Sequence, residues 1–197
     1  MNCEVKRIKR QDTRTFLNFI HYLRRMPQIT YAFGLFENKE LIGVCTFGYP
    51  GSPAIKKSML KEFRDEDVVI ELNRLCIKPE YNGKNYGSYF VSRCLKMLPN
   101  KTYVVSYADS GWSHCGYIYQ ATNWLYTGKQ KEGYVKWCWG KYPGHQERHN
   151  GEKEYYQFIS AKYRYIYHCR QEIKEGYAEK CRLGNNKGIS EMRRNKI

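Results

Sequence analysis

Residues 104–126, with the sequence VVSYADSGWSHCGYIYQATNWLY, constrain the fold more than any other part of the chain. They begin within an apolar strand predicted over residues 103–107, which ends at the turn-forming residues 108–111. A helix is predicted next, and it carries the candidate residues His114, Tyr117, Tyr119, Gln120 and Asn123. Another apolar run, residues 69–77, carries Glu71, Asn73 and Arg74. We interpret the two runs as neighbouring central strands whose polar residues form one active site.

The charge balance of the chain favours a polyanionic partner. Its 197 residues include 34 Lys and Arg against 19 Asp and Glu, a formal net charge of +15. Such an excess favours nucleic acid, and the 19 tyrosines can line a wet pocket or stack on bases. No apolar run is long enough to predict a membrane span. The eight scattered cysteines lack C-x-x-C spacing and favour a reducing cytoplasm.

The rest of the chain alternates strands and helices, which predicts an α+β fold with a mixed sheet. Further strands are predicted over residues 3–9, 30–37, 40–48, 68–77 and 162–168, and the second and third of these form a hairpin. Helices are predicted from Asp12 or Thr13 to Pro27, with Phe16, Leu17, Ile20 and Leu23 inward, and over residues 86–98. We predict a catalytic domain at 1–169, a basic and aromatic insertion at 127–157 and a basic C-terminal extension at 170–197.

A glycine-bearing turn precedes the helix predicted at residues 86–98. It reads NGKNYGS over residues 82–88, and such a turn presents free N–H groups and the positive end of a helix to a phosphate or another anion. The candidate cofactor-binding residues here and at the end of the preceding strand are Cys76, Ile77, Asn82, Gly83, Asn85, Gly87 and Ser88. An ordinary strand-to-helix turn is the alternative, because glycine spacing alone is a weak signal.

Polar residues of the central stretch are candidates for acid–base catalysis. Asp109 follows the strand at 103–107, so it could accept a proton, bind a metal or cap the next helix. Tyr119 could donate a proton or only pack in the core. His114 could act as a base or simply open the helix. Tyr107 completes the set of catalytic candidates.

Candidates for substrate binding fall into two groups. In the predicted site, a buried Arg74 needs Glu71 or a substrate phosphate as its partner. Asn73 is a further candidate for binding substrate or DNA there. Gln120 and Asn123 could read the Watson–Crick edge of a flipped base, although these helix residues could also face solvent. Outside it, the segment 129–153 could neutralise phosphates and stack on bases through Lys129, Lys131, Lys136, Trp137, Trp139, Lys141 and Arg148. The alternative for this segment is a solvated basic surface.

The order of elements resembles the GNAT acyltransferase superfamily, in which the turn before the corresponding helix holds the pyrophosphate of acyl-coenzyme A. This resemblance implies a mostly antiparallel central sheet that splays between its two middle strands, with helices on both faces. It implies acetyl-coenzyme A or another group donor as the cofactor. The turn NGKNYGS departs from the superfamily pattern of Arg or Gln, two residues, Gly, one residue, and Gly or Ala.

Four pieces of residues 30–168 are similar to the phage Mom family: LNRL (72–75), SYAD (106–109), H-x-G-x-IYQATNW-x-Y-x-G (114–128) and KYRY (162–165). This resemblance implies an enzyme that adds a carbamoylmethyl group to the exocyclic amine of adenine in double-stranded phage DNA. It would act in the cytoplasm of the host cell and protect the DNA from restriction. It also implies iron as a candidate metal, with Asp109, Tyr119, His21 and Tyr22 as candidate ligands.

Two other functions remain open on the residues themselves. An acyl-coenzyme A-dependent N-acyltransferase acting on a protein or small amine would bind coenzyme A tightly and show no preference for DNA. A non-catalytic DNA-binding module would keep salt-sensitive binding after replacement of Asp109. The sequence does not define the oligomeric state, and a homodimer is compatible with each function.

Overall fold

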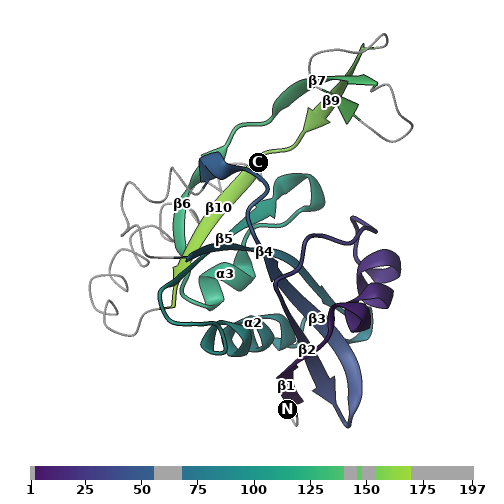
Figure 1. Ribbon diagram of the computed structural model, residues 1–197, viewed down its shortest axis with the longest axis vertical. Coiled ribbons are helices and arrows are strands. Elements are labelled where there is room, and N and C mark those ends of the chain that lie inside the picture. The colour runs from purple at the N-terminus through teal and green to yellow at the C-terminus, as the bar shows by residue number, and fades with distance from the viewer. Residues whose placement is uncertain (1–2, 56–67, 140–145, 148–153, 170–197) are drawn as a thin grey trace.

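The computed structural model describes residues 3–55, 68–139, 146–147 and 154–169, and its centre is one mixed sheet (Figure 1). Seven strands lie in the order β1-β2-β3-β4-β5-β10-β6. Neighbouring strands are antiparallel except β4 and β5, which are parallel. The strands are β1 (Cys3–Arg7), β2 (Tyr31–Glu37), β3 (Glu40–Gly48), β4 (Val68–Ile77), β5 (Thr102–Asp109), β6 (Leu125–Gln130) and β10 (Lys162–His168). The predicted α+β class and mostly antiparallel sheet are confirmed.

Helical segments cover both faces of this sheet. On one face, α2 (Tyr86–Lys96) buries Phe90 in a core cluster that includes Cys45 of β3. On the other face, Leu17 packs in a separate cluster with Val44, the residue before Cys45. Successive strand residues point to opposite faces of a sheet, so this one strand contributes to both clusters.

The first helix is shorter than predicted and irregular. It consists of η1 (Arg10–Thr13), a 3-10 turn, and η2 (Phe16–Ile20), a π-helix. The N–H of His21 closes η2 by donating to the carbonyl of Phe16 at 2.8 Å, and the backbone of His21 is then extended, so the helix ends there. Two predicted core residues, Ile20 and Leu23, therefore lie at the surface, where 37% and 36% of each is exposed.

The two middle strands, β4 and β5, pair over only part of their length. Residues 68–71 pair with residues 102–105, and beyond them no described strand pairs with that edge of β4. A β-bulge at Asn73 bends β4 at this point. The Asn73 amide holds the bulge, because it accepts a hydrogen bond from Thr46 Oγ1 (2.6 Å) and donates one to the Gln28 carbonyl (2.8 Å). The splay predicted between the middle strands is confirmed.

Three further strands form a second sheet, which projects from the main body in Figure 1. We call this sheet the arm; its strands are β8 (Gln146–Glu147), β7 (Gly133–Trp139) and β9 (Glu154–Ile159). The predicted insertion began at residue 127, but residues 127–130 belong to β6 of the central sheet. The predicted C-terminal extension, residues 170–197, lies outside the described residues.

The helix predicted after β5 is divided into two short segments. A 3-10 turn, η4 (Ser110–Trp112), follows β5 directly, and α3 (Tyr117–Ala121) begins several residues later. Gly116 separates them in a left-handed conformation (φ 75°), so the helical region starts later than the residue pattern predicted. Among the described residues, no helix has the length and apolar character needed to span a bilayer.

Candidate active site

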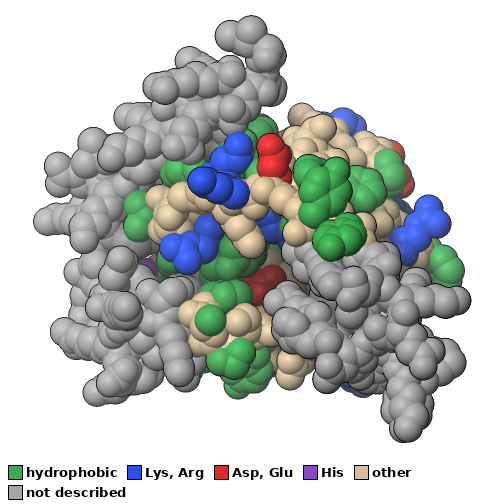
Figure 2. Space-filling model, turned by 90° about the horizontal axis from the view of Figure 1, so that it is seen from above, with side chains coloured by type: hydrophobic (Ala, Val, Ile, Leu, Met, Phe, Trp, Pro, Cys, Tyr) green, Lys and Arg blue, Asp and Glu red, His purple; other side chains and the backbone are tan. Residues whose placement is uncertain are grey.

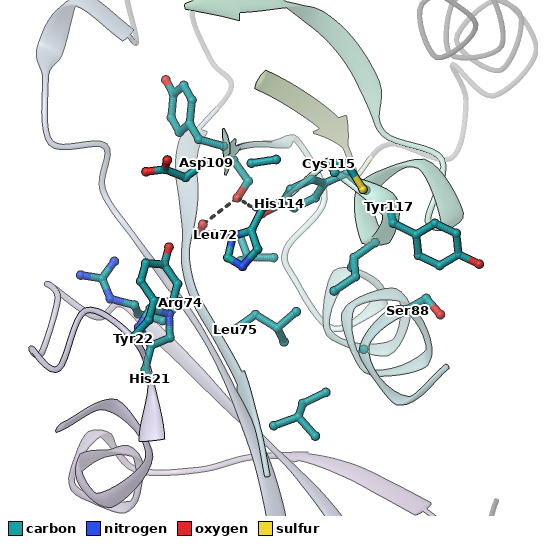
Figure 3. Close-up of a pocket in the computed structure, with 18 of the residues that line it drawn as sticks. His21, Tyr22, Leu72, Arg74, Leu75, Ser88, Asp109, His114, Cys115 and Tyr117 are labelled. Carbon is teal, nitrogen blue, oxygen red and sulfur yellow. Dashed lines mark hydrogen bonds between the residues drawn. The ribbon is translucent and has the colours of Figure 1, made fainter. Parts of the chain in front are cut away.

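A cavity of about 790 Å³ opens where β4 and β5 separate. Its walls come from both strands, the segment after η2, the turn before α2 and the loop between β5 and α3. Figure 3 shows one side formed by His21, Tyr22 and Arg74 and the other by Ser88, Cys115 and Tyr117. The turn before α2 forms one end, the turn end, and Asp109 marks the other, the Asp109 end.

The turn end is lined by most of the predicted cofactor-binding residues, Ile77, Asn82, Gly83, Asn85, Gly87 and Ser88. Asn85 adopts the left-handed conformation (φ 61°), and its side chain makes no capping hydrogen bond to α2. The first N–H groups of this helix are therefore not capped by that side chain and suit an anionic ligand. Gly87 lets α3 approach closely, because a Cβ there would lie 3.0 Å from Ile118 Cδ1.

Cys76 does not line the cavity, unlike the residue after it. Its side chain lies on the opposite face of β4, where the thiol is 3.7 Å from the carbonyl oxygen of Phe16. Burial raises the pKa of this thiol to about 11. The prediction grouped Cys76 with Ile77, but consecutive residues of a strand point to opposite faces, and the structure directs only Ile77 to the cavity.

Tyr119 lines the cavity from α3 and belongs to a short chain of hydrogen bonds. Its hydroxyl lies 2.8 Å from Ser106 Oγ, and the Ser106 hydroxyl donates to the carbonyl of Leu72 at 2.9 Å. Ser106 has one hydroxyl hydrogen, so Tyr119 is the donor in the first bond. The Tyr119 ring packs against Trp124 and Tyr165. Burial raises its pKa well above the ordinary value, so the phenol is protonated at neutral pH.

Asp109 ends β5, and three groups hold its carboxylate. Oδ1 accepts hydrogen bonds from the N–H of Gly111 at 3.0 Å and from the Ser160 hydroxyl, and Oδ2 lies 3.9 Å from Lys162 Nζ. The bond to Gly111 caps η4, so the capping role considered from the sequence is present. Asp109 also lines the cavity, where the charge of its carboxylate acts on His114.

His114 lies in the loop before α3, where its backbone N–H donates to the backbone carbonyl of Asp109 at 3.1 Å. Figure 3 shows its imidazole pointing into the cavity. Burial lowers the pKa of His114 below its ordinary 6.5, while attraction by the Asp109 carboxylate acts in the opposite direction. The imidazole is therefore neutral at neutral pH and able to accept a proton. Tyr107 also lines this end, and burial, with the nearby Glu71, raises its pKa.

Four aromatic rings meet at the Asp109 end and connect the two halves of the sheet. Tyr22 stacks on His21 with 4.3 Å between ring centroids. The ring centroid of Tyr22 also lies 4.6 Å from that of Trp112 and 5.4 Å from that of His114. Tyr22 comes from the N-terminal half of the chain and Trp112 from the loop after β5, so the ring contacts span the opening of the splay.

Arg74 and Glu71 add charge to the cavity wall. Arg74 Nη1 donates to the carbonyl of Asn73, whereas its buried Nε has no hydrogen-bond partner among the described residues. Burial and repulsion from Arg25 lower the pKa of Arg74. Burial raises the pKa of Glu71. Attraction by the Arg74 charge and a hydrogen bond from the backbone N–H of Gly51 act in the opposite direction. Arg74 can therefore donate to a bound ligand, while the Asn73 amide is engaged in the bulge.

The four predicted iron ligands, Asp109, Tyr119, His21 and Tyr22, all line the cavity, within the part of the chain that the structure describes. No three His, Cys, Asp or Glu side chains lie close enough together there to hold a metal ion. His21 Nδ1 accepts the N–H of Leu23 at 3.1 Å, which puts the imidazole proton on Nε2. Burial, with repulsion from Arg74, lowers the pKa of His21 to about 4. The hydroxyl of Tyr119 is already hydrogen-bonded to Ser106.

Two predicted base-binding residues do not line the cavity. Gln120 Nε2 donates to the Tyr165 hydroxyl and to the Cys115 carbonyl, both at 3.2 Å. Asn123 is exposed after the end of α3, with φ 61°. The prediction placed both on one long helix with Tyr119, but α3 ends before Asn123 and directs Gln120 toward β10 instead.

The predicted phosphate-binding residues lie on and beside the arm. Lys129 and Lys131 are exposed, and Lys129 Nζ lies 5.9 Å from the ring centroid of Tyr163. The backbone of Lys136, Trp137 and Trp139 belongs to β7. The side chains of these three, and all of Lys141 and Arg148, lie outside what the structure describes.

Sequence reasoning did not assign roles to Ser106, Trp112, Ser160 and Lys162. Each acts through a residue distant in the chain, as Ser160 does through Asp109. The available signal was indirect, because Ser106 belongs to the quoted SYAD motif and Lys162 to KYRY. Neither motif shows that its first residue contacts another strand.

Solved structures share this splayed architecture. Arabidopsis thaliana NAA60 in complex with acetyl-CoA matches with a TM-score of 0.56 and 11% identity, covering 84% of this chain and 99% of that one. A chimera of the spermidine N-acetyltransferase SpeG from Vibrio cholerae and hSSAT matches with a TM-score of 0.54 and 14% identity, covering 89% and 100%. At such identities the likeness concerns the fold alone, and it confirms the predicted GNAT-like fold.

Within this class, the chain belongs to the Mom protein family, whose model matches residues 2–183. Methylcarbamoylase mom of Escherichia phage Mu is 29% identical over 128 residues. That alignment covers 62% of this chain and 52% of the relative, so the chain spans about half the length of the curated relative that it matches. The membership predicted from the four motifs is confirmed.

Proposed function

We propose that the protein is a phage DNA-modifying transferase that adds a carbamoylmethyl group to the exocyclic amine of adenine in double-stranded DNA. The modification would protect the DNA from restriction within the host cytoplasm. Membership of the Mom family, the name of its phage Mu relative and the net charge of +15 support this proposal. The observation that carries it is the cavity, which joins the glycine-bearing turn before α2 to a histidine, a carboxylate and a protonated tyrosine.

His114 is the group best placed to accept a proton at the Asp109 end. The exocyclic amine of adenine must lose one proton as its nitrogen forms the new bond to carbon. The lowered pKa of His114 keeps its imidazole neutral before the reaction. The Asp109 carboxylate attracts the imidazolium that results and so favours the transfer. In this mechanism Asp109 serves mainly to stabilise charge and to position the loop.

Tyr119 is the candidate proton donor. Its raised pKa keeps the phenol protonated, and it lines the cavity between the two ends. Its hydrogen bond to Ser106 fixes the ring in one orientation, and Ser106 is itself fixed by Leu72. When the bond to the transferred group breaks, the phenol would turn its hydrogen from Ser106 to the leaving group and donate it there.

The donor would bind at the turn end, where the residues fit a phosphate-bearing molecule such as a coenzyme A derivative whose carbamoylmethyl CH2 carbon carries the leaving group. The N–H groups at the start of α2 would hold the phosphates, and Ile77 would contact an apolar segment. The beginning of α2 is tied to β2, because the Tyr86 hydroxyl donates to Glu37 at 2.7 Å. The donor would supply the transferred group, while the protein positions it against the amine.

Mass analysis of nucleosides tests this function directly. Plasmid DNA from cells expressing the protein should contain a deoxyadenosine heavier by one carbamoylmethyl group. His114→Asn and Tyr119→Phe should each abolish or strongly reduce that species, whereas Phe19→Ala, a change at an exposed residue of η2, should not. Unmodified deoxyadenosine under confirmed expression of folded wild-type protein would contradict the proposal.

The two alternatives give different results in the same system. An N-acyltransferase for proteins or small amines would leave the DNA unchanged and transfer an acetyl group from acetyl-coenzyme A to an amine. A non-catalytic module would bind DNA with the same affinity after Tyr119→Phe and modify nothing. The cavity volume and the two carboxylates in its wall, Glu71 and Asp109, are compatible with several kinds of amine substrate. The nucleoside analysis therefore decides between the three functions.

A further inference from the structure

One face of the arm carries an exposed aromatic stripe, which we call the arm face and define as Tyr134, Tyr156 and Phe158. Tyr134 of β7 is paired with Phe158 of β9, and their ring centroids lie 5.4 Å apart. Tyr156 precedes Phe158 by two residues, so the strand period puts both on the same side. The three rings therefore form one continuous surface on the projecting sheet.

The arm face is unusually exposed for its composition. Tyr134 is 73% exposed, Tyr156 66% and Phe158 54%. Large rings on a small projecting sheet gain little stability when they remain in water, and contiguous exposed apolar surface commonly marks a binding site. The rings need a partner with flat apolar surfaces, which nucleobases and sugars provide.

The arm is joined to the Asp109 end of the cavity. Ser160, immediately after β9, donates a hydrogen bond to Asp109. The next residue, Ala161, accepts the N–H of Ser110 at 2.9 Å, and Lys162 lies 3.9 Å from the carboxylate. A partner held on the arm is therefore attached, through one short connection, to the place where the amine would react.

The charge around the arm favours DNA over a second copy of the chain. The exposed residues Lys129 and Lys131 lie just before β7, and the whole chain carries +15. Two copies of such a chain repel each other, whereas phosphates are attracted. Figure 2 looks onto the end that bears the arm and shows Lys, Arg and hydrophobic side chains side by side around a hollow with a recessed acidic group.

We infer that the arm face contacts the bases and sugars of duplex DNA beside the target nucleotide, while Lys129 contacts a phosphate. The pair β7 and β9, to which β8 adds only two residues, is narrow enough to enter the major groove. Aromatic side chains can also enter between base steps that have opened. Either contact holds the duplex over the cavity as an adenine is extruded. The inference rests on the proposed function for its choice of substrate, and it adds the surface that binds the duplex.

The test measures binding of a 30-base-pair duplex by fluorescence anisotropy over a series of salt concentrations. The variants Tyr134→Thr and Phe158→Thr remove a ring but keep a residue that favours strands. Each should weaken binding by roughly 10- to 100-fold and leave the slope of log K against log salt unchanged, because no phosphate contact is lost. Lys129→Ala should reduce the magnitude of that slope by about 0.9.

Phe19→Ala is the matched control, because Phe19 is 76% exposed on η2, away from the arm. Its affinity and slope should equal those of the wild type. Circular dichroism of every variant would establish that it is folded. Wild-type affinity in both folded threonine variants would overturn the inference, as would a wild-type dimer that these substitutions dissociate.

The two proposals can fail separately. Loss of duplex binding in the threonine variants supports the arm face even if nucleoside analysis shows that wild-type protein modifies no adenine. Conversely, modified adenine with unchanged binding in both threonine variants retains the proposed function and rejects the arm face. Binding and chemistry are measured on the same full-length chain.

Discussion

The hydroxyl of Tyr119 lies 2.8 Å from that of Ser106, and this contact joins α3 to β5 at the point where β5 leaves β4. Ser106 then donates to the carbonyl of Leu72 at 2.9 Å, so a side chain takes the place of a backbone bond between the two strands. The separation of the strands thus both creates the cavity and orients the phenol within it.

Replacing Tyr119 with Phe should lower kcat for nucleoside modification by about 100-fold or more, the usual contribution of a positioned acid. The ring packing against Trp124 and Tyr165 is kept, so stability and KM should change little. Ser106→Ala should cause a smaller loss, because Tyr119 keeps its proton but loses its orientation. A Tyr119→Phe enzyme with most of its activity would remove Tyr119 from the mechanism.

Replacing Asp109 separates its charge from its structural role. Asn can still accept the hydrogen bonds from Gly111 and Ser160, so Asp109→Asn should fold normally. Without the carboxylate the pKa of His114 should fall further, and the acid limb of the kcat/KM profile should move to lower pH. Asp109→Ala should in addition destabilise the protein by about 1 kcal/mol through the lost cap. An unshifted acid limb in Asp109→Asn would show that His114 does not titrate in that limb.

Gly116 and Gly83 give a matched pair of backbone substitutions. Both have positive φ (75° and 79°), but a Cβ on Gly116 would lie 2.4 Å from the Tyr165 hydroxyl, whereas Gly83 has open space. Gly83→Ala should cost about 1 kcal/mol, and Gly116→Ala about 3 kcal/mol, because overlap adds to backbone strain. Denaturant unfolding measures both. Equal destabilisation would mean that α3 can shift away from Tyr165.

His21 should make stability depend on pH. Its pKa is about 4 in the folded protein against an ordinary 6.5, so the unfolded chain binds the proton first as pH falls. Stability is therefore lost between pH 6.5 and pH 4, by about 3 kcal/mol, and not further below. His21→Asn keeps an acceptor for Leu23 and should remove this part of the dependence. Parallel unfolding curves for the two proteins from pH 7 to pH 4 would contradict a neutral buried His21.

Several elements could be predicted because local patterns define them. The strand at residues 68–77 and the strand at 162–168 have the predicted limits, since alternating apolar and aromatic residues end at clear breaks. The hairpin turn also formed as predicted, although Asn38 and Lys39 both require positive φ (49° and 67°) without a glycine. Asn tolerates this conformation better than most residues, which offsets part of the cost.

The limits of the helices and the directions of side chains were harder to predict from the sequence. The π-helical turn at Phe16–Ile20 ends the first helix early, and no residue pattern announces it. Cys76 and Ile77 were grouped by position, but the pleat sends them to opposite faces. Gln120 is a polar helix residue whose direction depends on Tyr165, which lies 45 residues later. Such contacts arise only when distant segments meet.

By itself the sequence determined six of the seven strands of the central sheet, the glycine-bearing turn before α2, the excess of positive charge and the motifs that mark the family, because each depends on residues close together in the chain. Only the tertiary structure decided that β4 bends at Asn73 and leaves β5, that Ser106 connects the two, and that Ser160 joins the arm to Asp109. The physical reason is that this cavity lies between the unpaired edges of β4 and β5, and which strand edges pair depends on contacts throughout the sheet.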